Sequence, residues 1–79
     1  MINKTDFLKN FAGQFEQTTY TDLSFDQCIR ELEEWSSLIG LGVLAMIRDC
    51  YNVTLYIKEL ETVNTIEDLY QTVNKKANK

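Results

Sequence analysis

The sequence contains no histidine, so the commonest general base and the commonest metal ligand are both missing. This absence excludes every catalytic pair built on Ser–His or Cys–His. The two cysteines, Cys28 and Cys50, are too few for a disulfide framework and lack the spacing of a zinc site. We expect both to be small buried groups. The sequence therefore predicts no metal site, no catalytic residue and no enzyme activity.

Long hydrophobic runs are missing as well. The longest apolar stretch, Leu38 to Ile47, is too short to span a bilayer and is interrupted by two glycines. Residues Met1 to Lys4 lead directly into a polar, periodic segment and not into the apolar region of a secretion signal. We therefore expect a cytoplasmic protein without a membrane span.

Basic residues are scarce outside the C-terminus. The chain has 12 acidic and 8 basic residues, which give a net charge of −4, and three of the eight cations are Lys75, Lys76 and Lys79. Residues 1–70 therefore hold 5 basic against 12 acidic residues. A surface of this sign repels phosphate backbones, which argues against nucleic acid and favours a basic protein partner.

The length of 79 residues suits a single domain, 1–79, with one small core. A hydrophobic fraction of 44% is sufficient for such a core. Proline is absent, so helix caps and clusters of Thr, Asn and Asp must separate the elements. A Rossmann domain or a two-domain enzyme would need a longer chain.

Apolar residues at helical spacing predict three main helices. The first covers residues 5–17 and is capped by Thr5. The second covers residues 38–51, with Ser36 or Ser37 as its cap. The third opens at Thr65, with acidic residues in its first turn.

Two shorter helices are expected over residues 25–34 and 57–63, the latter burying Ile57 and Leu60. Residues 52–56 alternate like a strand but have no partner, so we interpret them as an extended loop. The arc of helix 38–51 expected to face the core is Gly40, Leu41, Val43, Leu44, Ile47 and Tyr51. The sequence thus predicts an all-α fold, a small helical bundle of three main helices plus one or two short ones.

Three local patterns have ordinary structural interpretations. The run from Gly40 to Ala45 fits G-x-G-x-x-A, but it lies inside a helix and not at the strand-to-helix turn that nucleotide binding needs. Glu31, Glu33 and Glu34 are typical of a solvated helix face, or alternatively of an acidic docking surface. Trp35, the single tryptophan, is expected to anchor the entry to the following helix.

The stretch Trp35-Ser36-Ser37-Leu38 resembles the attachment motif of acyl carrier proteins, which reads Asp-Ser-Leu and often Trp-Asp-Ser-Leu. Upstream, residues 29–34 are similar to that family's Phe-x-x-Leu-x-x run, and residues 65–69 are similar to its Thr-Val-x-Asp-Leu opening of the last helix. The family's aliphatic and aromatic positions are matched by Leu41, Leu44, Ile47, Tyr51 and Leu55. The resemblance is weak over residues 1–20 and good over residues 29–73.

The resemblance implies a monomeric carrier of the bacterial type, with an acyl-carrier-like bundle and a phosphopantetheine arm on Ser37. A phosphopantetheinyl transferase would install this arm from coenzyme A, so the chain would need no base of its own. The arm would hold acyl groups as thioesters, for fatty-acid synthesis or for a specialised acyl or aminoacyl pathway. The bundle would shelter an acyl chain between its helices, and acyl-transfer or synthase enzymes would dock around the serine.

The chain departs from the family pattern at two places. Ser36 replaces the family's aspartate, which removes one negative charge and adds a second hydroxyl beside Ser37. The following helix lacks the family's many acids, and one of its faces carries Ile39, Gly42, Met46 and Asp49. This face is expected either to be covered by another helix or the first loop, or to be a docking stripe. In the second case Glu31, Glu33 and Glu34 would supply any electrostatic steering.

These departures leave a second interpretation open. The chain is then a carrier-like helical bundle without the arm, acting as a protein-interaction module. Attachment of phosphopantetheine distinguishes the two interpretations.

Overall fold

The computed structural model describes residues 2–77, in which four α-helices and two 3-10 helices occur and no β-strand is formed. The helices are α1 (Lys4–Ala12), η1 (Tyr20–Asp22), η2 (Ile29–Glu31), α2 (Ser37–Tyr51), α3 (Ile57–Thr62) and α4 (Ile66–Ala77). A single antiparallel bridge joins Cys28 to Thr65. The predicted all-α helical bundle is confirmed.

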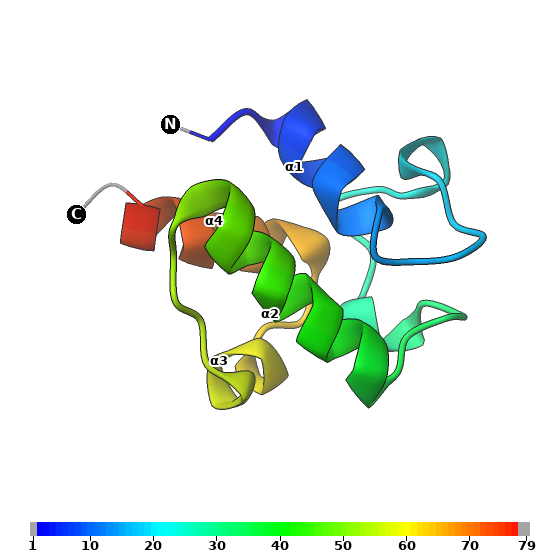
Figure 1. Cartoon of the computed structure of the whole chain (residues 1–79). Coiled ribbons are helices and arrows are strands. Elements are labelled where there is room, and N and C mark those ends of the chain that lie inside the picture. Colours follow the sequence, from blue (N-terminus) through cyan, green and yellow to red (C-terminus); the bar gives the residue numbers. More distant parts are fainter. Residues whose placement is uncertain (1, 78–79) are drawn as a thin grey trace.

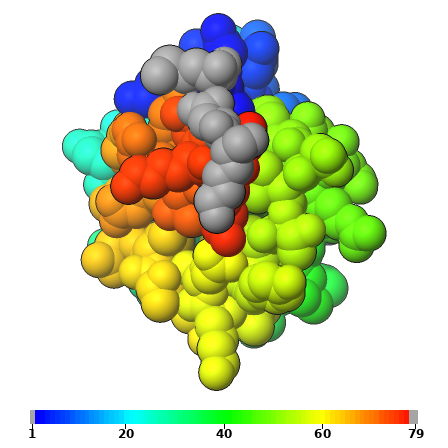
Figure 2. All heavy atoms as spheres, turned by 90° about the vertical axis from the view of Figure 1, so that its left-hand side faces the viewer, coloured from blue at the N-terminus to red at the C-terminus, as the bar shows by residue number. Residues whose placement is uncertain are grey.

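The helices enclose one apolar core. In Figure 1 the long helix α2 crosses in front of α4, α1 lies above both, and α3 lies below the loop that follows α2. Figure 2 shows the face on which α4 (orange to red), α3 (yellow) and the end of α2 with its following loop (yellow-green) meet. The largest fully buried side chains are Phe7, Phe11, Ile29, Val43, Ile47, Ile66, Leu69 and Val73.

Helix α1 is shorter than predicted and starts with a different cap. The side chain of Asn3, not of Thr5, accepts a hydrogen bond of 2.9 Å from the backbone N–H of Asp6. The helix ends at Ala12, so the predicted extension to Gln17 is wrong. Residues beyond it turn away because their backbone N–H groups bond to a carboxylate from a distant segment, described below.

The predicted helix over residues 25–34 is also wrong, because only Ile29–Glu31 forms a 3-10 helix there. The backbone of this segment pairs instead with the connection between α3 and α4. The Ile29 N–H donates to the Asn64 carbonyl at 2.8 Å, and the Ile66 N–H donates to the Gln27 carbonyl at 3.1 Å. These long-range bonds use groups that a local helix would have needed.

The remaining elements follow the sequence more closely. Residues 52–56 form an extended loop, as predicted, after Asn52 ends α2 in the left-handed conformation with φ of 54°. At the start of α4, the Thr65 hydroxyl accepts a hydrogen bond from the Asp68 N–H, and the Asp68 carboxylate accepts from the Thr65 N–H. Leu60 is buried as expected, but Ile57 is 45% exposed.

Three other burial predictions are wrong. Leu41, expected in the core, is 54% exposed. Cys50 is exposed and Cys28 is half-buried, so neither is the fully buried group that we expected.

Candidate functional site

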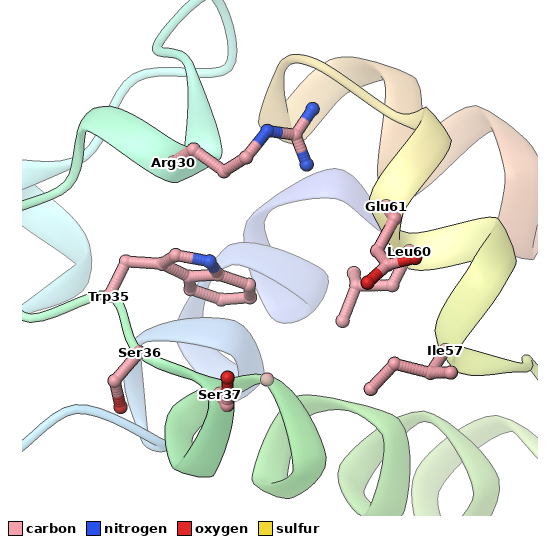
Figure 3. A pocket seen from close by; sticks show the side chains of 8 residues that line it. Arg30, Trp35, Ser36, Ser37, Ile57, Leu60 and Glu61 are labelled. Carbon is pink, nitrogen blue, oxygen red and sulfur yellow. The ribbon is translucent and has the colours of Figure 1, made fainter.

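Ser36 and Ser37 stand at the start of α2 and have different structural roles. Ser36 is the N-cap, and its hydroxyl oxygen accepts a hydrogen bond of 3.3 Å from the Ile39 N–H. Ser37 is the first helical residue and is exposed, and its hydroxyl forms no hydrogen bond within residues 2–77. In Figure 3 the Ser37 oxygen points towards a pocket, whereas the Ser36 oxygen points away from it.

The pocket beside Ser37 has a volume of about 370 Å³ and lies between the start of α2, η2 and α3. Its lining residues are Arg30, Trp35, Ser36, Ser37, Gly40, Ile57, Leu60 and Glu61. Figure 3 shows Trp35 on one side and Ile57 with Leu60 on the other, so two apolar walls face each other across the space. Ser37 therefore lies at the edge of a largely apolar hollow.

Arg30 is the cation of this pocket. Its guanidinium donates hydrogen bonds to the Val63 carbonyl at 2.5 Å and to Asn64 Oδ1 at 3.3 Å. These bonds hold η2 against the connection between α3 and α4, and they fix the position of the positive charge. Glu61 supplies a carboxylate on the α3 side of the same pocket.

The surroundings of Ser37 fit a phosphodiester. The first turn of α2 contains no acidic residue. The free N–H groups and the dipole of a helix N-terminus favour an anion at this position. Arg30 and Glu61, one cation and one anion, line the same pocket across from Ser37 (Figure 3). The residues present are thus compatible with a phosphate-linked group on the Ser37 hydroxyl.

The expected docking stripe on α2 is contradicted at its centre. Met46 is only 6% exposed and belongs to the core. Ile39 is half-buried and packs against the core, and Gly42 lies under the side chain of Gln14, which follows α1. Since α1 and the first loop cover this side of α2, the alternative of a covered face is the correct one. Asp49 alone of the four is exposed.

The acidic residues before α2 divide into two groups. Glu31 and Glu33 are exposed, and neither lines the pocket beside Ser37. Glu34 is half-buried, and its carboxylate accepts hydrogen bonds from the Thr18 hydroxyl and from the N–H groups of Glu16 and Gln17. The Thr18 hydroxyl and these backbone donors lower the pKa of Glu34 below its usual value. Glu34 is therefore a loop anchor and not a free docking charge.

Sequence reasoning missed several residues that the fold brings to the site. Arg30, Ile57, Leu60 and Glu61 line the pocket, and Leu38 is 77% exposed next to Ser37. The only signal in the sequence was Gly40, whose missing side chain indicated close approach by another element. Trp35, expected as an anchor at the entry to α2, does pack there and contacts the Phe15 ring at a centroid distance of 6.4 Å.

Comparisons of this chain with protein-family models, with curated proteins and with solved structures find no match. Within residues 2–77, no helix has the length and apolar character needed to cross a membrane. The same residues contain no cluster of three or more acidic or cysteine side chains suited to a metal ion.

Proposed function

We propose that this protein is a carrier that holds acyl groups on a phosphopantetheine arm attached to Ser37. The observation that carries the proposal is the contrast between the two adjacent serines. The Ser36 hydroxyl oxygen accepts the helix-capping bond, whereas the Ser37 hydroxyl is free, exposed and directed towards an apolar pocket. The resemblance of residues 35–38 to the acyl carrier attachment motif points to the same serine.

In this proposal Ser37 contributes one oxygen atom. That oxygen attacks a phosphorus of coenzyme A and forms the new P–O bond, the P–O bond to the adenosine-bearing phosphate breaks, and this phosphate leaves. The proton of the hydroxyl passes to a base of the phosphopantetheinyl transferase, which is consistent with the absence of histidine from the chain. The attached arm supplies a thiol on which acyl groups are carried.

The chain's own residues would orient and hold the phosphate end of the arm. The N–H groups at the start of α2 would face the phosphodiester, apart from that of Ile39, which already donates to the Ser36 hydroxyl. The Arg30 guanidinium lies across the pocket and bonds to Val63 and Asn64, so it would act on the phosphate only through its charge. Ser36 in place of an aspartate leaves this turn without a negative charge. We therefore expect no charge repulsion of the phosphodiester in this turn. The missing charge should also make association with the transferase slower, because electrostatic steering is weaker.

Partner enzymes would approach over Leu38 and Leu41. These side chains are 77% and 54% exposed, and Leu38 directly follows Ser37 in the first turn of α2. An enzyme that reaches the Ser37 oxygen must pass close to Leu38. Apolar contact at this position replaces the charged contact that the expected acids would have made, so docking should depend only weakly on salt.

The test is labelling by coenzyme A and a broad-specificity phosphopantetheinyl transferase, measured by intact mass. The native chain should gain one arm, Ser37→Ala should gain none, and Ser36→Gly should still be labelled. Glycine is the better replacement at position 36, because at an N-cap it costs only a few tenths of a kcal/mol, against about 1 kcal/mol for alanine. Labelling of Ser37→Ala that disappears in Ser36→Gly would reverse the assignment.

The second candidate is an interaction module without an arm. The exposed Leu38 and Leu41, together with the missing acids of α2, favour it. It becomes the better account if neither the broad-specificity enzyme nor a lysate of the native cells labels the chain.

A further inference from the structure

Two of the side chains that line the pocket beside Ser37 approach each other over Gly40 and narrow the pocket there. A Cβ atom placed on Gly40 would lie 3.3 Å from Leu60 Cδ2 and 3.4 Å from Trp35 Cζ2, so these two carbons are no more than about 6.7 Å apart. A methylene chain passing between two carbons needs about 7–8 Å, since each carbon–carbon contact takes about 3.5–4.0 Å. The gap between Trp35 and Leu60 is therefore too narrow for an alkyl chain.

Both of these side chains are held from behind. The Trp35 ring packs against Phe15, and Phe15 packs against Phe11 with centroids 5.3 Å apart. Phe11 is fully buried, and Leu60 is 4% exposed. Moving either side chain would disturb the core residues packed against it, so this narrow point should resist opening.

The volume of the pocket also limits the length of the acyl chain that it can hold. The pocket has a volume of about 370 Å³. The end of an arm and the chain it carries must share this space. Arg30 and Glu61 also line the pocket, and neither charged group favours contact with a long alkyl chain.

We infer that the cargo carried on Ser37 is a short acyl group, and that Trp35 and Leu60 set the limit on its length. The inference rests on the proposed function, and it adds the class of substrate. A short chain fits beside Ile57 without passing between Trp35 and Leu60, whereas a long chain has to leave the pocket and remain in water.

The test loads the chain with arms from acetyl-, butyryl-, hexanoyl-, decanoyl- and palmitoyl-coenzyme A and confirms each product by intact mass. The readouts are the midpoint of thermal unfolding and the emission of Trp35, the single tryptophan, which lines the pocket. Short chains should shift the emission and raise the midpoint by about 5 °C over the unacylated arm, because they bind only the folded state. Decanoyl and palmitoyl chains should add nothing further.

A midpoint that keeps rising through decanoyl to palmitoyl would overturn the inference. So would a series in which no chain changes either readout, because the pocket then holds no cargo.

A pair of variants assigns the limit to this narrow point. Leu60→Val shortens a wall of the pocket and should shift the limit to longer chains. Leu44→Val makes the same change on α2, outside this pocket, and should leave the limit unchanged. Equal behaviour of the two variants would contradict the role given to Leu60.

Failure of loading contradicts the proposed function and not the size of the pocket. In that case the unmodified chain is titrated with the N-acetylcysteamine thioesters of butyrate and of decanoate. Saturable quenching of Trp35 by the butyrate compound alone supports the length limit. Binding of the decanoate compound, or of neither compound, overturns it.

Discussion

At the scale of single residues, the orientation of α2 determines which of its side chains are buried in the core and which are exposed to partner proteins. Met46 is 6% exposed and Leu41 is 54% exposed, although the spacing of apolar residues indicated the reverse. We expect Met46→Ala to lower the free energy of unfolding by about 2–5 kcal/mol, the usual range for a large buried side chain. Leu41→Ala should change it by less than about 0.5 kcal/mol, as at other surface positions.

Chemical denaturation of the two variants measures both values. A stable Met46→Ala variant together with a destabilised Leu41→Ala variant would restore the docking stripe and remove the exposed apolar surface near Ser37.

Both serines were recognised as candidates from the sequence, and only their contacts separate them. The pattern Ser-Ser-Leu allows either hydroxyl to cap the helix, because N-cap and first-turn positions differ by one residue. The structure gives the capping bond to Ser36. Arg30 was beyond prediction because its position depends on bonds to the Val63 carbonyl and to Asn64, more than thirty residues away in the sequence.

At the scale of elements, Glu34 links the segment before α2 to the loop after α1. Its carboxylate accepts from the Thr18 hydroxyl and from backbone N–H groups, which lowers its pKa from the ordinary value of 4.5. The carboxyl group of Asp68 has a lowered pKa for a similar reason, because it accepts from the N–H groups of Thr65 and Asn64. Both anchors therefore work in the ionised form.

We expect stability to fall as the pH drops below about 4.5, because a group with a lowered pKa in the folded state takes up protons more readily when the chain unfolds. Glu34→Gln should lower the thermal midpoint at neutral pH and weaken its dependence on pH between about 5 and 3. Glu33→Gln, an exposed neighbour, is the control and should leave the pH dependence close to that of the native chain. Identical pH profiles of the two variants would show that Glu34 does not anchor the loop.

Elements with local caps could be predicted, and elements that depend on distant partners could not. Helix α4 begins where Thr65 and Asp68 exchange hydrogen bonds three residues apart, a signal contained in the sequence. The end of α1 depends on Glu34, and the loss of the helix over 25–34 depends on Asn64. Both partners lie farther along the sequence than the few turns over which helical periodicity can be recognised.

At the scale of the whole molecule, the two ends of the described chain are joined. The Ile2 N–H donates to Asn74 Oδ1 at 3.0 Å, the Tyr70 hydroxyl donates to the Ile2 carbonyl at 2.6 Å, and Lys4 pairs with Glu67 at 2.8 Å. These contacts connect α1 to α4 on the side away from Ser37. The class of fold was predictable because the apolar content and helical periodicity of 79 residues suffice for one bundle.

The central claim is that Ser37 carries a phosphopantetheine arm. The most direct measurement is the intact mass of the protein purified from its own cells, followed by fragmentation to locate any added mass. The account predicts one phosphopantetheine adduct, with or without an acyl group, on Ser37. A population of unmodified mass alone, or an adduct on Ser36, would contradict it.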